Sequence, residues 1–199
     1  MIPVVILAAG RSERMRRSKA LLPIGESGDT FIARLISTFR SADSDDVIVV
    51  LRPDDVLLRT AVEYDGARIV ENPDADRGQL SSVITGLDAV DRPGVNAILV
   101  MPVDIPLVRV ETIRAVKAAF LASAAPVARA VHEGRHGHPV IFARRVFDEL
   151  RRADPHTGAR AVVRAHAHDL LNVEVDDPGI LRDVDTPDDY DQFIPRSSA

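Results

Sequence analysis

The chain has 199 residues, a formal net charge of −5, 46% hydrophobic residues and no cysteine. The missing cysteines exclude disulfides, cysteine-ligated zinc and thiol catalysis, and no apolar stretch approaches the roughly 20 residues of a membrane span. The acidic balance disfavours a dedicated nucleic-acid binder. We therefore expect a cytoplasmic, globular protein that acts on small molecules, with no nucleic-acid or membrane partner.

The first 121 residues alternate short apolar runs with segments whose apolar residues recur at helical spacing. Strands are expected over residues 3–8, 46–51, 68–70 and 97–101. Helices are expected over residues 30–40, 80–90 and 111–121, with a short helix after Pro53. Such alternation predicts βαβ units on a mostly parallel sheet.

After residue 121 the pattern becomes less regular. Strands are expected over residues 125–131, 138–142 and 170–175, and helices over residues 146–151, 158–167 and 187–193. A Gly- and His-rich turn over residues 132–137 would join the first two of these strands. There are no repeats or evident linkers, so we expect one domain over residues 1–194 and a frayed C-terminal tail over residues 195–199.

A glycine- and arginine-rich loop follows the first strand directly, where open parallel sheets bind their ligands. Gly10 and the small residues before it would let a phosphate approach backbone N–H groups. The spacing lacks the glycines of the dinucleotide-binding and Walker phosphate loops, so this would be a phosphate cradle of another kind. The alternative is a solvated basic surface loop. The residues expected to face a triphosphate are Ala8, Ala9, Gly10, Arg11, Arg14 and Lys19.

A carboxylate held between two prolines, Asp104, ends the strand over residues 97–101. It would lie at the same sheet edge as the phosphate loop, where a carboxylate beside a polyphosphate needs a hard cation between them. Mg²⁺ typically takes one or two carboxylates plus phosphate oxygens and water. Asp104 is therefore the first expected Mg²⁺ ligand, with a turn or helix-cap role as the alternative. Asp185 is the expected second ligand, with Asp183 as the fallback, whereas Asp188 and Asp189 fit the first turn of a helix.

In order along the chain, these motifs resemble the MobA-like NTP transferases, most closely the molybdenum cofactor cytidylyltransferase (MocA-like) branch. The resemblance covers nearly the whole chain. It is carried by Leu-Ala-Ala-Gly-x-Ser-x-Arg-Met at residues 7–15, Lys-Ala-Leu-Leu-Pro at 19–23, Gly-x-x-x-Ser at 78–82, Gly-Leu at 86–87, Pro-Val-Asp-x-Pro at 102–106, Gly-His-Pro-Val-Ile-Phe at 137–142, Gly-Ala-Arg at 158–160 and Asp-Val-Asp-Thr-Pro-x-Asp-Tyr at 183–190.

The resemblance implies a Rossmann-like three-layer α/β/α fold of the nucleotide-diphospho-sugar transferase type. It implies that Leu7, the loop residues after it, Arg14 and Lys19 hold the NTP, and that Asp104 and Asp185 hold Mg²⁺. Gln79, Ser81 and Ser82 would read the base and ribose, although the serines also fit a helix N-terminus. His138 and Arg160 would border the acceptor pocket, although a turn or core role suits His138 equally.

The doublet Ala8-Ala9 resembles the CTP-using branch, whereas the GTP-using branch tends to have Ala-Gly-Gly. The implied activity is transfer of CMP from CTP to a phosphorylated acceptor, molybdopterin, with release of pyrophosphate and a client molybdoenzyme as a partner. Arg16 stands where the family has glycine, and residues 153–157 depart from the family pattern. The alternatives are a GTP-using or sugar- or alcohol-phosphate transferase, a nicotinamide or flavin oxidoreductase, and a non-catalytic protein that binds a cofactor for delivery.

Overall fold

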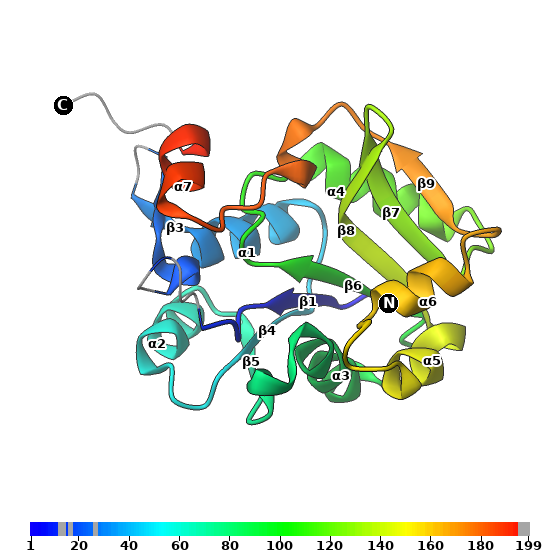
Figure 1. The fold of residues 1–199 in the computed structure, drawn as a ribbon, viewed down its shortest axis with the longest axis horizontal. Coiled ribbons are helices and arrows are strands. Elements are labelled where there is room, and N and C mark those ends of the chain that lie inside the picture. Colours follow the sequence, from blue (N-terminus) through cyan, green and yellow to red (C-terminus); the bar gives the residue numbers. More distant parts are fainter. Residues whose placement is uncertain (12–14, 16–17, 26–27, 195–199) are drawn as a thin grey trace.

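The computed structural model describes residues 1–11, 15, 18–25 and 28–194. A seven-stranded sheet in the order β5-β4-β1-β6-β8-β7-β9 forms its centre (Figure 1). The strands are β1 (Val4–Leu7), β4 (Val47–Leu51), β5 (Arg68–Glu71), β6 (Ala97–Pro102), β7 (Val127–His132), β8 (Arg135–Ala143) and β9 (Leu171–Glu174). A small antiparallel pair, β2 (Pro23–Ile24) and β3 (Asp29–Thr30), stands apart from it. The strand β8 is antiparallel to both of its neighbours, and the other pairs are parallel.

Helices cover both faces of the sheet, which confirms the expected three-layer fold (Figure 1). One face packs against α1 (Phe31–Ser41), α2 (Val56–Tyr64) and α4 (Val110–Leu121), and the other against α3 (Gln79–Val90), α5 (Phe147–Arg152) and α6 (Arg160–Ala165). The last helix is α7 (Pro187–Phe193). Short 3-10 turns are η2 (Lys19–Leu21), η3 (Ala75–Arg77), η4 (Arg144–Val146) and η5 (Pro178–Leu181).

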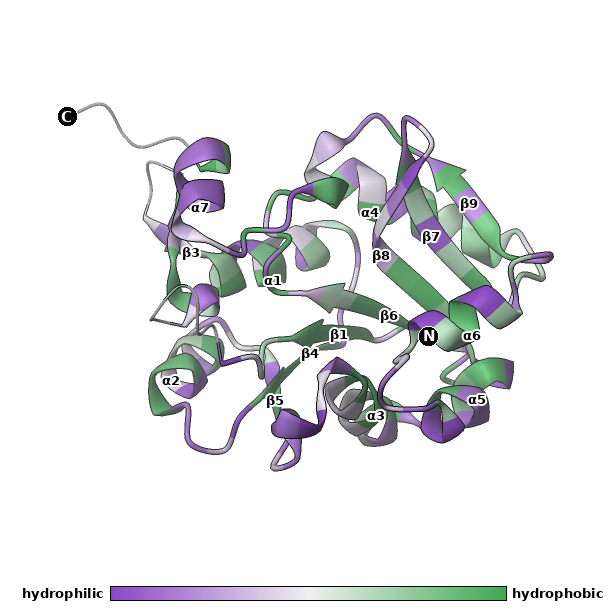
Figure 2. Ribbon diagram, viewed as in Figure 1, coloured by the Kyte–Doolittle hydropathy of each residue, from purple (hydrophilic) through white to green (hydrophobic). Residues whose placement is uncertain are grey.

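Successive side chains of the central strands pack alternately into the hydrophobic cores on the two faces of the sheet. Val4 and Ile6 pack against the α1 side, whereas Val5 and Leu7 pack against the α3 side. Because both faces are covered, β1 needs apolar side chains at every position, and Figure 2 shows the central strands as a hydrophobic band. This explains why the run without polar alternation predicted a strand.

The approach of α3 to the sheet depends on Gly86. A Cβ at this position would lie 2.3 Å from Val5 Cγ1 and 3.1 Å from Val50 Cγ2. Any side chain would therefore push α3 away from β1 and β4. The glycine therefore lets α3 pack directly against β1 and β4.

Two expected boundaries were wrong. The expected turn over residues 132–137 is a two-residue turn, Glu133-Gly134, and β8 already begins at Arg135. Both turn residues have positive φ, 50° and 73°, which suits the twist of a tight hairpin. The helix expected over residues 158–167 is the shorter α6, because Gly158 at φ 64° stands outside it.

None of the helices in the described ranges is long and apolar enough to cross a membrane.

Candidate nucleotide and acceptor site

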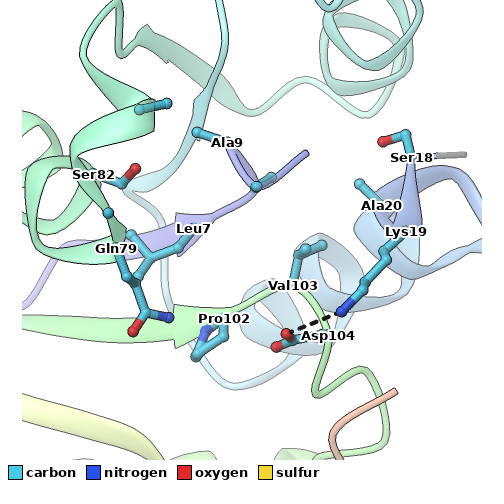
Figure 3. Close-up of a pocket in the computed structure, with 14 residues that line it drawn as sticks. Leu7, Ala9, Ser18, Lys19, Ala20, Gln79, Ser82, Pro102, Val103 and Asp104 are labelled. Carbon is cyan, nitrogen blue, oxygen red and sulfur yellow. Dashed lines mark ion pairs between the residues drawn. The ribbon is translucent and has the colours of Figure 1, made fainter. Parts of the chain in front are cut away.

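The carboxyl ends of two adjacent parallel strands form the centre of the site. Leu7, the last residue of β1, lies beside Pro102, the last residue of β6. A cavity of about 260 Å³ opens there (Figure 3). Its lining consists of Leu7, Ala8, Ala9, Gly10, Ser18, Lys19, Ala20, Ala75, Gly78, Gln79, Ser82, Pro102, Val103 and Asp104. The sheet thus brings together the loop after β1, the start of α3 and the acidic residue after β6.

Lys19 joins two carboxylates that are far away in the sequence. Its Nζ lies 3.7 Å from Asp104 Oδ2, and it also forms an ion pair with Asp185 Oδ1. The pair with Asp104 is marked in Figure 3. The lysine side chain is only 13% exposed, so water screens these pairs weakly. The expectation that Lys19 and Asp104 share one rim of the sheet agrees with this geometry.

Two carboxyl groups near Lys19 have raised pKa values, those of Asp104 and Asp183. Burial raises the pKa of Asp104, and the nearby charges of Asp183 and Asp185 raise it further, while Lys19 opposes them. Burial also raises the pKa of Asp183, again helped by Asp185. The charges of these carboxyl groups raise one another's pKa values, so a cation placed between them would favour their ionised forms.

Asp188 and Asp189 lie in the first turn of α7, as the sequence indicated. Thr186 and Asp189 form a reciprocal capping box, and Asp189 Oδ2 also accepts from the N–H of Asp185 at 3.1 Å. The hydrogen bond from Thr186 is the main reason why the pKa of Asp189 is lowered. The cap therefore fixes the backbone of Asp185 beside Lys19.

The start of α3 is held by Asn72, a residue that the sequence analysis did not single out. Its side chain is buried, with 1% exposed, and its Nδ2 donates to Ser81 Oγ and Ser82 Oγ at 2.9 Å each. Ser82 and Gln79 line the cavity. Ser81 does not, because its hydroxyl donates to the carbonyls of Asp74 and Gly78. The available signal was an asparagine directly after β5, at the same sheet edge.

Arg11 makes a two-pronged pair with Asp76 in η3, with N–O distances of 2.8 and 2.7 Å. Arg52, which follows β4, donates two hydrogen bonds of 3.0 Å each to the same carboxylate. The two guanidinium groups hold the pKa of Asp76 well below its usual range. This pair ties the loop after β1 to the turn before α3. Arg14 and Arg16 lie outside the described residues.

A second cavity of about 760 Å³ adjoins the first and shares Leu7 and Gln79 with it. It lies among β8, the loop before α6 and η5, and Asp183, His138 and Arg160 line it. Burial lowers the pKa of His138 to about 4, so this imidazole is neutral at pH 7. Gly137 allows η5 to come close, because a Cβ there would lie 2.2 Å from the carbonyl oxygen of Ile180. The structure thus places Asp183, His138 and Arg160 around one space.

The chain matches the model of one protein family, described as the MobA-like NTP transferase domain, over residues 4–170. It is 29% identical to the purine catabolism protein PucB of Bacillus subtilis, over 94% of this chain and 93% of that protein. It is 33% identical to a molybdenum cofactor guanylyltransferase of Rhodopseudomonas palustris (70% and 63%). It is 25% identical to the molybdenum cofactor cytidylyltransferase of Escherichia coli (95% and 93%).

Solved structures with the same fold include Rv0371c of Mycobacterium tuberculosis, which is 32% identical with a TM-score of 0.83, covering 97% of this chain and 96% of that chain. A structure of the same mycobacterial protein in complex with manganese is 30% identical with a TM-score of 0.76, covering 97% of both chains. These two matches cover nearly the full length of both chains. The aligned part of this chain therefore includes the residues that line both cavities and the segment that carries Asp185.

Proposed function

Since the chain is a nucleotidyltransferase that belongs to the MobA-like NTP transferase family, we propose that it transfers CMP from CTP to molybdopterin and releases pyrophosphate. The observation that carries this proposal is the ion-paired cluster of Lys19, Asp104 and Asp185 at the mouth of the first cavity. It puts a cation and two carboxylates where the loop after β1 presents its backbone. Such a set suits a triphosphate with a divalent cation.

The residues of the cluster fit a divalent cation. Carboxylate oxygens are the ligands that Mg²⁺ and Mn²⁺ prefer, and Asp104 and Asp185 both contact the same ammonium group. The described residues contain no group of three or more acidic or histidine side chains that could hold a metal ion. Mg²⁺ typically takes only one or two protein carboxylates, with phosphate oxygens and water as its remaining ligands, and Asp104 and Asp185 would supply these two. When bound, the ion would supply charge neutralisation on the phosphates.

In the proposed reaction, an oxygen of the acceptor phosphate forms a bond to the α-phosphorus of CTP. The bond between that phosphorus and the oxygen that bridges to the β-phosphate breaks, and pyrophosphate leaves with the electron pair. Lys19 would stabilise the negative charge on the phosphates, and backbone N–H groups of Ala9 and Gly10 would bind their oxygens. The acceptor phosphate is already ionised at neutral pH, so no strong general base is needed.

The second cavity would hold the acceptor. It adjoins the nucleotide cavity through Leu7 and Gln79, so an acceptor there could reach the α-phosphorus. Its lining combines apolar residues such as Val140 and Phe142 with His138 and Arg160. A ring system of the acceptor would pack on Val140 and Phe142, while Arg160 would bind the acceptor's phosphate.

The alanine pair at the end of β1 supports CTP. Ala8 and Ala9 are both buried and line the nucleotide cavity. A methyl group on Ala9 takes space that a glycine would leave open, which favours a pyrimidine over a larger purine. The guanylyltransferase similarity makes GTP the second candidate. In this account Gln79 and Ser82 contact the base and ribose, and Ser81 positions Ser82 through Asn72.

A pyrophosphate-release assay tests the proposal. Each of the four NTPs is supplied with Mg²⁺ and molybdopterin. Turnover with CTP at a kcat/KM at least tenfold above that with GTP supports it. Turnover with GTP alone supports the second candidate, and binding of molybdopterin without pyrophosphate from any NTP supports a non-catalytic carrier.

A further inference from the structure

Arginines without acidic partners surround the second cavity. Arg129, Arg135, Arg160 and Arg164 all line it, and Asp183 is the acidic residue in the same lining. Several arginines elsewhere in the chain pair closely with carboxylates, as Arg68 does with Asp46 at 2.7 Å. Within the described ranges, no ion pair with a carboxylate is formed by Arg129, Arg135 or Arg164. In a chain with a net charge of −5, this local surplus of positive charge marks an anion-binding surface.

Arg129 is the most informative of the three. It is half-buried in the middle of β7, and its Nε donates to Asn172 Oδ1 of β9 at 2.8 Å. Burial lowers the pKa of its guanidinium, with no carboxylate nearby to offset that effect. A charge that is partly removed from water without a counter-ion is unfavourable, so an anion in the cavity would relieve it.

The position of Arg129 separates it from the reacting centre. Arg129 is the register partner of Val140 on β8, and β8 lies between β7 and β6, the strand that leads to Asp104. Two strand spacings correspond to about 10 Å across the sheet. Arg160 lies near the reacting end instead, because its charge acts on both Asp183 and His138. The cavity therefore has two cationic ends.

We propose that the acceptor carries a second oxyanion group, distinct from the phosphate that attacks the nucleotide, and that Arg129 binds it with Arg135 and Arg164 at the rim. This inference rests on the proposed function, in that it takes the second cavity as the acceptor site. An acceptor whose only anionic group is the attacking phosphate would leave the guanidinium of Arg129 without an anionic partner. The proposal thus defines the acceptor class: a small molecule with an apolar middle and anionic groups at both ends.

Calorimetric titration of the nucleotide-free protein with inorganic phosphate tests the oxyanion site without turnover. We expect three sites in the wild type, one at the loop after β1, one at Arg160 and one at Arg129. Lys19→Ala keeps the last two, and Arg129→Gln keeps the first two. The control Arg34→Gln, an exposed position on α1, keeps all three. Titration with acetate shows whether a carboxylate serves as well as a tetrahedral oxyanion.

The inference is overturned if Lys19→Ala abolishes phosphate binding while Arg129→Gln leaves it unchanged. It is also overturned if the wild type binds no phosphate. Arg129→Lys, which retains the charge, should retain the site, and thermal melting confirms that both variants are folded. With turnover established, Arg129→Gln should raise KM for the acceptor about tenfold or more without changing KM for CTP. If no NTP gives pyrophosphate, the proposed function fails while the titration still decides the oxyanion site.

Discussion

The backbone N–H of Val184 donates a 2.8 Å hydrogen bond to the carbonyl of Asp104. This bond places the segment that carries Asp183 and Asp185 directly against the loop after β6. Asp185 then pairs with Lys19, whereas Asp183 lines the second cavity. One backbone contact thus assembles the carboxylates of the nucleotide cavity and an acidic group of the adjoining cavity. In the account proposed here, the reaction occurs at this junction.

Replacing Lys19 should remove turnover. We expect Lys19→Ala to lower kcat about 100-fold or more, because the ammonium group lies beside the phosphates. Lys19→Arg should not restore it, since a planar guanidinium does not replace a compact ammonium between two carboxylates. The turnover of both variants is measured by pyrophosphate release, and circular dichroism checks that they are folded. Wild-type rates in Lys19→Ala would remove this residue from the catalytic set.

Divalent cations should stabilise the protein through the two carboxylates. After treatment with EDTA, adding Mn²⁺ or Mg²⁺ at 100 times its Kd should add about 2.7 kcal/mol to the free energy of unfolding. For a chain of this size that corresponds to a rise in Tm of about 5–10 °C. Asp104→Asn and Asp185→Asn should lose this rise, whereas Asp188→Asn, on the exposed first turn of α7, should keep it. Equal shifts in all three variants would place the ion elsewhere.

Asn72→Ala should affect both stability and nucleotide binding. The substitution leaves the hydroxyls of Ser81 and Ser82 without their donor and should cost about 1–3 kcal/mol of unfolding free energy. It also loosens the start of α3, so KM for CTP should increase. Urea denaturation and steady-state kinetics measure the two effects. Asn96→Ala, at an exposed position, is the control and should stay within about 0.5 kcal/mol of wild type.

His138 should make stability depend on pH. Its pKa in the folded protein is about 4, below its usual value of 6.5, so the unfolded chain binds more protons in this range. The contribution is fully present above pH 6.5 and is lost as the pH falls toward 4. His138→Gln should flatten the unfolding free energy between pH 6.5 and 4, whereas His168→Gln, with a side chain that is 78% exposed, should not. Parallel curves for wild type and His138→Gln would contradict the buried neutral imidazole.

The sequence predicted the central strands and the placement of Asp104 well, for a physical reason. A strand covered on both faces must be apolar at every position, so β4 and β6 stand out in the sequence. Because parallel strands end at one edge, the loop after β1 and Asp104 were expected to meet there. The residue roles themselves stay predictions.

Contacts between segments far apart in the chain could not be predicted from the sequence. Arg11 and Asp76 are 65 residues apart, and no local pattern indicates that they pair. Arg129 occupies an alternating polar position of β7, which is typical of a solvent-facing side chain, yet it lines a cavity because α6 and its preceding loop cover that face. The hairpin after β7 was placed wrongly because Glu133 adopts a positive φ that is uncommon for glutamate.

The most direct test of the central claim is pyrophosphate release by Asp104→Asn, measured with CTP, Mg²⁺ and molybdopterin beside a thermal melt. We expect kcat to fall about 100-fold or more. We also expect the metal-free Tm to stay the same or rise, since burial and the neighbouring carboxylates raise the pKa of Asp104 and so make its charged form less favourable. Turnover at the wild-type rate by a folded Asp104→Asn protein would contradict the assignment of this rim as the nucleotide and metal site.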